Sequence, residues 1–313
     1  PIPATVPGCV HTDLLAAGLI PDPYLDDNEL RLGWIGRTEW IYETAFTWTD
    51  PGAQRVDLVC DGLDTVAEVA LNGVVVGRTE NMHRRYRFDL AGALRAGDNR
   101  LTVRFTAPYA YAEHWRAELG DRPGPYAEPY MFIRKMACNF GWDWGPTLVT
   151  SGIWRPIGLH AWSVARIAQV RPRADARGRL VAHVEVERLE AGELDLTVSV
   201  AGVSRSATLA TGRTTAVVEL HVPHAALWWP RGHGVQPLYD LTVTLSDPPG
   251  PAGGRRHDVW RGRVGFRDVA LDTADGAFTL RINGVPVFAR GVNWIPDDAF
   301  PHRVDRDRYA ARL

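Results

Sequence analysis

The sequence predicts a mainly β protein in which two antiparallel sandwiches are followed by the beginning of an α/β domain. Three observations support this fold class. Short runs of alternating apolar and polar residues recur along most of the chain, turns rich in glycine and asparagine separate those runs, and the last residues change to a strand followed by a helix. With 313 residues, of which 45% are hydrophobic and 23% charged, the chain is long enough for two or more folded domains.

The first predicted domain, residues 1–162, starts with an irregular stretch. Four prolines between residues 3 and 33 leave room for one short helix, near residues 12–17. From residue 40 the pattern becomes that of short strands, with a hairpin turn at Asn72-Gly73, which is typical of a β-sandwich or jelly roll. Strands are predicted at residues 40–48, 56–60, 66–71, 74–76, 87–90, 101–105 and 153–162.

The alternation fails in residues 108–145, which are rich in aromatic side chains. A loop of roughly forty residues inside a compact domain is usually functional or disordered, and this aromatic content argues against disorder. Near its end, Trp142 and Trp144 flank Asp143, with glycines and a proline on either side. Indole faces stack on the C–H surfaces of sugars and a carboxylate accepts hydrogen bonds from hydroxyl groups, so this stretch predicts a sugar-binding site.

Residues 163–267 form the second predicted domain. An arginine-rich segment at 166–179 is interpreted as the boundary, and the clean alternation that follows over about a hundred residues suits an immunoglobulin-like sandwich. A loop is predicted at residues 248–254. Strands are predicted at residues 180–186, 194–200, 215–222 and 238–245.

The third predicted domain, residues 268–313, contains a hairpin centred on Asn283-Gly284, a strand at 289–294, and a helix that Asp305 caps at its N-terminus. A strand followed by a helix begins an α/β unit. Since a (β/α)8 barrel needs about 250 residues, we expect this domain to be cut early in the given chain.

The composition excludes several classes of function. A formal net charge of −2 provides neither the basic field that binds nucleic acid nor a polybasic surface for membranes, and no run of 18 apolar residues occurs. Three widely spaced cysteines, Cys9, Cys60 and Cys138, suggest neither a disulfide framework nor a zinc site, and they favour a reducing, cytoplasmic location. We expect no metal site and no cofactor.

Motifs along nearly the whole chain resemble those of glycoside hydrolase family 2, and within it those of the β-mannosidases. The motifs Leu71-Asn-Gly73 and Gly291-Val-Asn-Trp-Ile-Pro296 resemble sequences general to the family, whereas Trp-Asp-Trp between Gly141 and Gly145-Pro resembles the β-mannosidase branch. The other motifs that carry the resemblance, in the order of the family, are Val6-Pro-Gly-Cys-Val-His11, Arg37-Thr-Glu-Trp-Ile-Tyr42, Asp61-Gly-Leu-Asp-Thr65, Leu227-Trp-Trp-Pro230 and Gln236-Pro-Leu-Tyr239.

This resemblance implies a jelly-roll sugar-binding domain, an immunoglobulin-like sandwich, and the first strand and helix of a truncated TIM barrel. It also implies that Trp142, Asp143 and Trp144 contact a terminal mannose from the first domain, while Asn293 and Trp294 face it from the end of the first barrel strand. The implied partner is a β-mannoside oligosaccharide, and a homodimer stays open.

Members of the family hydrolyse with retention of configuration, using one glutamate as acid/base and another as nucleophile about 5 Å apart. After Glu193 the only glutamate of this chain is Glu219, which lies in a sandwich strand pattern. No catalytic residue is therefore assigned, and we expect the segment alone to be an inactive part of an exo-β-mannosidase. Alternatives are another family 2 glycosidase (β-galactosidase, β-glucuronidase or exo-β-glucosaminidase) and a carbohydrate-binding module without catalysis.

Structural roles for the same side chains also stay open. The two tryptophans could be core residues of the jelly roll, Asp143 could cap its own turn, and Trp294 could pack beneath the next loop. Lys135 could orient Asp143. Asp297 and Asp298 could pair with neighbouring arginines.

Overall fold

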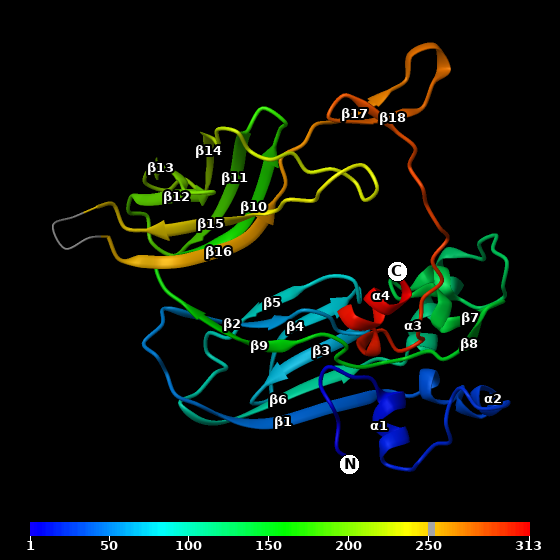
Figure 1. Cartoon of the computed structure of the whole chain (residues 1–313). Helices are drawn as coiled ribbons and strands as arrows, with labels where there is room; N and C mark the ends of the chain where they lie inside the picture. The colour runs from blue at the N-terminus through cyan, green and yellow to red at the C-terminus, as the bar shows by residue number, and fades with distance from the viewer. Residues whose placement is uncertain (250–253) are drawn as a thin grey trace. The chain divides into compact units, whose positions relative to one another are not determined.

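The computed structural model describes residues 1–249 and 254–313. The chain divides into two compact units, and each is described by itself (Figure 1). Unit 1 comprises Pro1–Ala161 together with Asn293–Leu313, and unit 2 comprises Trp162–Val292. The predicted fold class, mainly β with two successive sandwiches and a short terminal helix, is confirmed.

Unit 1 is built on two β-sheets whose facing side chains form its core. The larger sheet is antiparallel and has the order β1 (Trp40–Trp48), β6 (Gly97–Phe105), β3 (Val66–Leu71), β4 (Val74–Glu80). The smaller sheet has the order β5 (Tyr86–Asp89), β2 (Arg55–Cys60), β9 (Ile157–Trp162). Alternate residues of β3 are buried, as a strand with one face on a core requires. The core contains Leu58, Cys60, Val69, Leu71, Val103 and Phe105.

Three helices in the N-terminal part of unit 1, residues 1–161, lie outside these sheets: α1 (Val10–Ala16), α2 (Asn28–Leu32) and α3 (Pro108–Leu119). The prediction that all of residues 108–145 are irregular is wrong for α3. Pro108 occupies the first helical turn, where its missing N–H costs nothing, and good helix formers follow it. Its apolar face is hard to recognise in the sequence, because Tyr109 and Ala112 are buried while the aromatic Trp115 is exposed.

The stretch after α3 includes a short hairpin of strands β7 (Phe140–Trp142) and β8 (Gly145–Thr147). Short 3₁₀ helices occur in both units, at Ile35–Arg37, Tyr130–Phe132, Ala137–Asn139, Ala274–Gly276 and Pro301–Arg303.

Unit 2 is a sandwich of a three-stranded and a four-stranded antiparallel sheet, with the orders β10-β11-β14 and β13-β12-β15-β16. Leu180, Leu196 and Val198 lie in its core, each fully buried. The strand bounds are β10 (Ala165–Ala174), β11 (Arg179–Arg188), β12 (Leu194–Val200), β13 (Val203–Leu209), β14 (Thr215–His221), β15 (Tyr239–Ser246) and β16 (Arg256–Val264).

Strand β10 occupies much of the segment 166–179, which the sequence predicted to be a boundary. Its pairing register with β11 shifts between Ile167 and Gln169, and this irregularity breaks the two-residue periodicity on which strand prediction depends. The loop predicted at residues 248–254 lies partly outside the described residues, at 250–253.

A small antiparallel sheet of β17 (Val269–Asp272), β18 (Thr279–Ile282) and β19 (Val285–Val287) ends unit 2. The predicted turn between β18 and β19 is confirmed, since Asn283 and Gly284 have φ angles of 50° and 81°.

The C-terminal part of unit 1 contains the predicted helix, α4 (Arg306–Arg312), and Asp305 caps it by accepting a hydrogen bond from the Arg308 amide at 2.8 Å. The strand predicted at residues 289–294 is not formed, and residues 288–296, which pass from unit 2 to unit 1, are exposed and irregular. A buried parallel strand needs hydrogen-bonded neighbours on both sides, and residues 289–294 have none. No helix among the described residues is long and apolar enough to cross a membrane.

Candidate functional site

The Trp-Asp-Trp stretch is the tip of the β7–β8 hairpin. Phe140 pairs with Thr147 and Trp142 with Gly145, so that Asp143 and Trp144 form the turn. Both indoles are exposed at the surface, Trp142 by 37% and Trp144 by 38%. The alternative that these tryptophans belong to the jelly-roll core is therefore wrong.

The base of this hairpin is held firmly although its tip is exposed. Phe140 is buried edge-on against Tyr109 of α3, with ring centroids 5.3 Å apart. The Thr147 amide donates a hydrogen bond to Glu29 Oε2 of α2 at 2.6 Å. Gly141 has a φ of +89°, and a Cβ atom there would lie 2.4 Å from Thr147 Oγ1. The hairpin therefore requires glycine at this position.

The carboxylate of Asp143 is exposed and has no hydrogen bond or ion pair within residues 1–249 and 254–313. It does not cap its own turn. Beside it, the Trp142 ring lies 4.9 Å from the ring of Tyr126 in an edge-to-face contact. The hairpin thus presents two partly exposed indoles and a carboxylate with all its acceptor positions available, which is a chemical combination that suits sugar hydroxyl and C–H groups.

Lys135 does not orient Asp143, contrary to one interpretation of the sequence. Its side chain is fully buried and forms an ion pair with Asp64, with Nζ 2.6 Å from Oδ1 and 2.5 Å from Oδ2. The Thr150 hydroxyl is 2.8 Å away and accepts a third hydrogen bond. Asp64 could not be identified as the partner from local patterns, because it lies 71 residues earlier in the chain.

The other two predicted site residues, Asn293 and Trp294, lie in the exposed irregular segment before α4. Trp294 is 42% exposed, and its ring lies 6.2 Å from that of Tyr309 in α4. No strand end positions Asn293 among the described residues, so its direction toward a sugar stays a prediction. Trp294 is neither buried nor fully free.

The two aspartates after this segment serve a structural purpose, as the alternative interpretation held. Asp297 forms ion pairs with Arg308 and Arg312 of α4. Asp298 accepts hydrogen bonds from Arg303 Nε at 2.8 Å and Arg308 Nη1 at 3.0 Å. Together these pairs join residues 297–298 to the last helix.

Burial opposes ionisation of the Asp298 carboxyl, but donors around it outweigh that effect and its pKa lies below the usual range. These donors are the Phe300 amide at 2.9 Å, the Tyr24 hydroxyl at 2.8 Å, and Arg303. The Ala299 amide in turn donates to the Tyr24 hydroxyl at 2.7 Å. Tyr24 of the N-terminal segment thus connects residues 298 and 299 by hydrogen bonds.

A buried anchor joins the hairpin to the segment that carries Asn293 and Trp294. Phe300 is 1% exposed and packs with Cys9 and with Leu148, the residue directly after β8. Asn139, directly before β7, donates from Nδ2 to the Ala299 carbonyl at 3.3 Å. Both ends of the hairpin therefore contact residues 299–300. Sequence reasoning missed Asn139 and Phe300, since neither belongs to a local periodic pattern.

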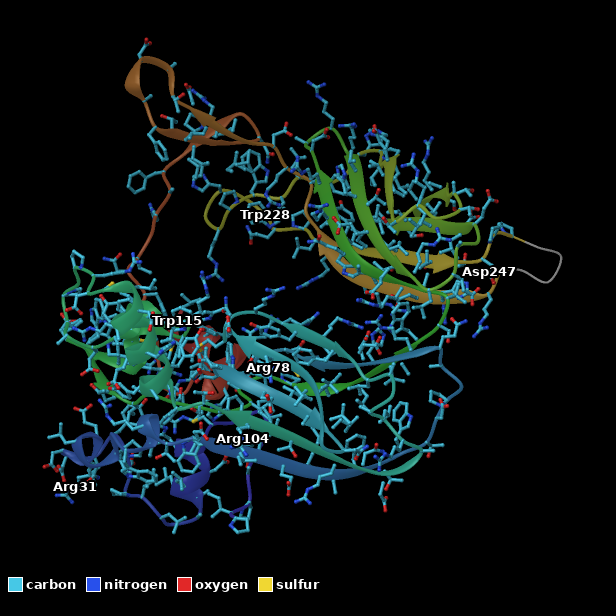
Figure 2. The ribbon with its side chains drawn as sticks, turned by 180° about the vertical axis from the view of Figure 1, so that it is seen from behind. Arg31, Arg78, Arg104, Trp115, Trp228 and Asp247 are labelled. Atoms are coloured by element: carbon cyan, nitrogen blue, oxygen red, sulfur yellow. The ribbon has the colours of Figure 1, made fainter. Side chains whose placement is uncertain are left out.

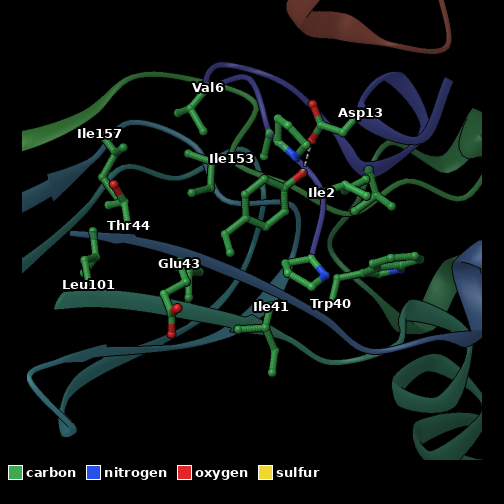
Figure 3. A pocket seen from close by; sticks show the side chains of 16 residues that line it. Ile2, Val6, Asp13, Trp40, Ile41, Glu43, Thr44, Leu101, Ile153 and Ile157 are labelled. Atoms are coloured by element: carbon green, nitrogen blue, oxygen red, sulfur yellow. Dashed lines mark hydrogen bonds between the residues drawn. The ribbon is translucent and has the colours of Figure 1, made fainter. Parts of the chain in front are cut away.

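Two clefts of unit 1 lie apart from these residues. The first, about 630 Å³, is lined mainly by aliphatic side chains of residues 1–6 and β1, next to the hydrogen bond from the Tyr42 hydroxyl to Asp13 Oδ2 (Figure 3). The second, about 600 Å³, is lined by one face of α3, including Trp115, which is at the surface of unit 1 (Figure 2). Neither cleft includes any of the five predicted site residues.

No group of three or more histidine, cysteine, aspartate or glutamate side chains in the described ranges could hold a metal ion. The three cysteines are free thiols, and burial raises the pKa of Cys9 to about 11 and that of Cys60 to about 12.

Comparison with known proteins identifies two consecutive family matches. Residues 1–155 match the family described as "Glycosyl hydrolase 2 galactose-binding domain-like", and residues 165–267 match "Glycosyl hydrolases family 2". The β-mannosidase of Capra hircus is 34% identical over 98% of this chain, and β-mannosidase B of Emericella nidulans is 34% identical over 97%. In both cases the chain spans 38% of the length of the relative.

Solved structures agree with these matches. The β-D-mannosidase of Dictyoglomus thermophilum has a TM-score of 0.89 at 34% identity, over 98% of this chain and 39% of that one. An exo-chitosanase from Amycolatopsis orientalis has a TM-score of 0.75 over 99% of this chain and 35% of its own, and at 23% identity it supports the fold alone. The two family matches, the two sandwiches and the Trp-Asp-Trp hairpin show that the chain belongs to glycoside hydrolase family 2 and is similar to part of its β-mannosidases.

Proposed function

We propose that the chain is part of a retaining exo-β-mannosidase, which hydrolyses terminal non-reducing β-D-mannose residues, and that it supplies part of the mannose subsite. The observation that carries this proposal is the shared anchor at residues 299–300, which contacts both ends of the β7–β8 hairpin and follows the segment of Asn293 and Trp294 in the chain. This anchor supports a common sugar-binding role for the hairpin residues 142–144 and for Asn293 and Trp294. The names of the relatives support mannose as the sugar.

In this proposal, Trp142 and Trp144 stack on the mannose ring and Asp143 accepts hydrogen bonds from its hydroxyl groups. The available acceptors of Asp143 support that role, because a carboxylate already engaged in an ion pair would have to break it first. Asn293 and Trp294 complete the contacts. We also propose the domain division 1–162, 163–267 and 268–313, with the third being the start of the catalytic barrel.

The catalytic glutamates are not among these residues. Glu219 is in β14 of unit 2, where its exposed carboxylate accepts hydrogen bonds from Arg179 at 2.6 and 2.8 Å. An exposed ion pair on a sandwich strand has neither the raised pKa of a general acid nor a second carboxylate at the separation that retention requires. The 313 residues alone should therefore hydrolyse nothing.

The proposed binding partner is a β-mannoside oligosaccharide, and no nucleic acid is proposed to bind. A homodimer is compatible with this function. A cytoplasmic location is supported by three free thiols with no disulfide. No cofactor or metal is needed for hydrolysis by two carboxylates.

The test is a substrate panel with the full-length protein encoded by the gene. We expect a nitrophenyl β-mannoside to be hydrolysed with kcat/KM at least a hundredfold above that for the β-galactoside, β-glucuronide and β-glucosaminide. A preference for one of the other three glycosides would identify a different family 2 glycosidase. Binding without any hydrolysis would favour a carbohydrate-binding module.

A further inference from the structure

Lys135 is the only lysine in a chain whose lysines and arginines total 35. Its side chain is fully buried, and Nζ has an acceptor for each of its three protons: both oxygens of Asp64 and the Thr150 hydroxyl, at 2.5 to 2.8 Å. An ammonium group presents three donors from one compact centre, whereas a guanidinium group presents five donors in a rigid plane. The three acceptors around Nζ therefore match the donor geometry of an ammonium group.

The contacts of this lysine continue on both sides of the hairpin. The Thr150 hydroxyl donates to Asp64 Oδ2 at 2.6 Å and lies 3.4 Å from Asn139 Oδ1. Asn139 is fully buried and uses Nδ2 to bind the Ala299 carbonyl at 3.3 Å. We call Asp64, Lys135, Asn139 and Thr150 the Lys135 cluster. It connects the residues directly before β3 of the larger sheet to the segments on both sides of the hairpin 140–147.

A contribution to stability alone does not explain this cluster. Replacing a buried ion pair by neutral side chains of similar volume is often neutral or stabilising, because desolvation of two charges offsets their attraction. Burial lowers the pKa of Lys135, and the charge of Asp64 opposes that shift. What a buried pair does supply is a defined geometry, since each donor and acceptor must be met at hydrogen-bond distance.

We propose that the Lys135 cluster positions the hairpin 140–147 relative to residues 299–300, and so fixes the Trp142–Trp144 turn in the sugar subsite. All four of its members are buried, so they act as positioning residues and not as groups that contact the sugar. The proposal rests on the function proposed above, and its test includes a measurement that does not depend on activity.

The central variant is Asp64→Asn/Lys135→Met, which removes both charges at similar volume. Lys135→Met alone leaves Asp64 buried without its partner, and we expect it to lower thermal stability markedly. The double variant should recover most of that stability while kcat/KM for a β-mannoside stays at least tenfold below wild type. Recovery of both stability and kcat/KM in the double variant would overturn the proposal.

A double-mutant cycle adds a readout that a purely structural role would not change. Asp143→Ala should cost less in the Asp64→Asn/Lys135→Met background than in wild type, because the hairpin that carries it is already displaced. Asp57→Asn is the matched control. Asp57 is fully buried and bound by Arg55 at 2.8 Å and Arg87 at 2.9 Å, on β2 of the smaller sheet. In that background the cost of Asp143→Ala should be unchanged, and equal costs in all three backgrounds would argue against positioning.

The measurement independent of activity uses the 313-residue chain. Lys135 is its only side-chain amine, so mass spectrometry after treatment with an amine-reactive ester should find Lys135 unmodified in the folded protein and modified after denaturation. In Asp64→Asn/Lys135→Met, amide hydrogen exchange of residues 139–148 and 297–301 should increase at least tenfold, with no change in unit 2. Unaltered exchange in both segments would refute the positioning role even if the full-length protein proves not to be a mannosidase.

Discussion

Asn139 and Ala299 are 160 positions apart in the chain, yet the Asn139 side chain donates a hydrogen bond to the Ala299 carbonyl at 3.3 Å. Next to this contact, the ring of Phe300 is buried with Cys9 and Leu148. The two contacts attach residues 299–300, which precede α4, to the jelly roll and to both flanks of the β7–β8 hairpin.

Phe300→Ala should detach the C-terminal segment from unit 1. Truncating a fully buried phenylalanine costs about 3–5 kcal/mol, because apolar contacts are lost and a cavity remains. We expect limited proteolysis to cut within residues 293–305 while β1–β9 stay protected. The matched control is Phe288→Ala, since Phe288 is 82% exposed and should leave proteolysis unchanged. Equal resistance of both variants would contradict the anchor.

Gly141→Ala should distort the hairpin, whereas Gly145→Ala should not. A Cβ at residue 141 would lie 2.4 Å from Thr147 Oγ1 at a φ of +89°, while a Cβ at residue 145 meets nothing within 4 Å. We expect a loss of about 1–3 kcal/mol in the unfolding free energy for the first substitution only. Chemical denaturation of the 313-residue chain measures it, and similar midpoints for the two variants would disprove the steric argument.

Unit 1 should lose stability as the pH falls from 7 to 5. His11 is 1% exposed, its ring lies 5.6 Å from that of Phe300, and Nδ1 has no hydrogen-bond partner within the described residues. Burial, with a smaller effect from the charge of Lys135, lowers its pKa to about 3. Below about pH 6.5 the imidazole of His11 is protonated in the unfolded chain but stays neutral in the folded chain. Each further unit of pH decrease therefore lowers the free energy of unfolding by up to about 1.4 kcal/mol.

The control for this pH effect is His11→Gln, which cannot titrate. Its melting temperature should depend less on pH between 7 and 5 than that of wild type. Burial also lowers the pKa of His302, so this residue should preserve part of the loss of stability at low pH in the variant. Burial raises the pKa of Asp13, so protonation of this carboxyl should stabilise the fold as the pH falls further. Parallel curves for the two proteins would show that His11 is not the titrating group.

Asp143→Ala in the full-length protein should reduce kcat/KM for a β-mannoside by roughly two powers of ten. Hydrogen bonds to an ionised group contribute about 1.5–3 kcal/mol each, and those that strengthen in the transition state act on kcat. Asp121→Ala is the control, since Asp121 is exposed and paired with Arg116. Nearly normal kcat/KM for Asp143→Ala would remove this carboxylate from the site.

Local patterns were sufficient to predict most of the fold. The alternation in β3, the Asn72-Gly73 turn and the Asp305 cap are encoded within a few residues, and the structure has each of them. The errors have local causes as well. The register shift in β10 and the aromatic residues of α3 conceal the period of an element that does form.

The candidate site could be predicted only in part. A short local motif singles out the group Trp142, Asp143 and Trp144, but whether its indoles are exposed is left open by the sequence and is answered by the structure. The ion pair of Lys135 with Asp64 and the packing of Phe300 depend on residues far apart in the sequence, and no short-range pattern indicates such partners. Residues 289–294 are apolar enough for a strand, but a strand of a parallel sheet exists only beside its neighbours.

The anchor at Phe300 also has a consequence for synthesis on the ribosome. Unit 1 is discontinuous, since residues 162–292 are translated between the jelly roll and the segment that completes it. At about 5–20 residues per second, the apolar surface of Cys9 and Leu148 waits on the order of ten seconds before Phe300 leaves the exit tunnel. During that interval the nascent jelly roll is open to chaperones, and its folding can finish only after the second sandwich has been made.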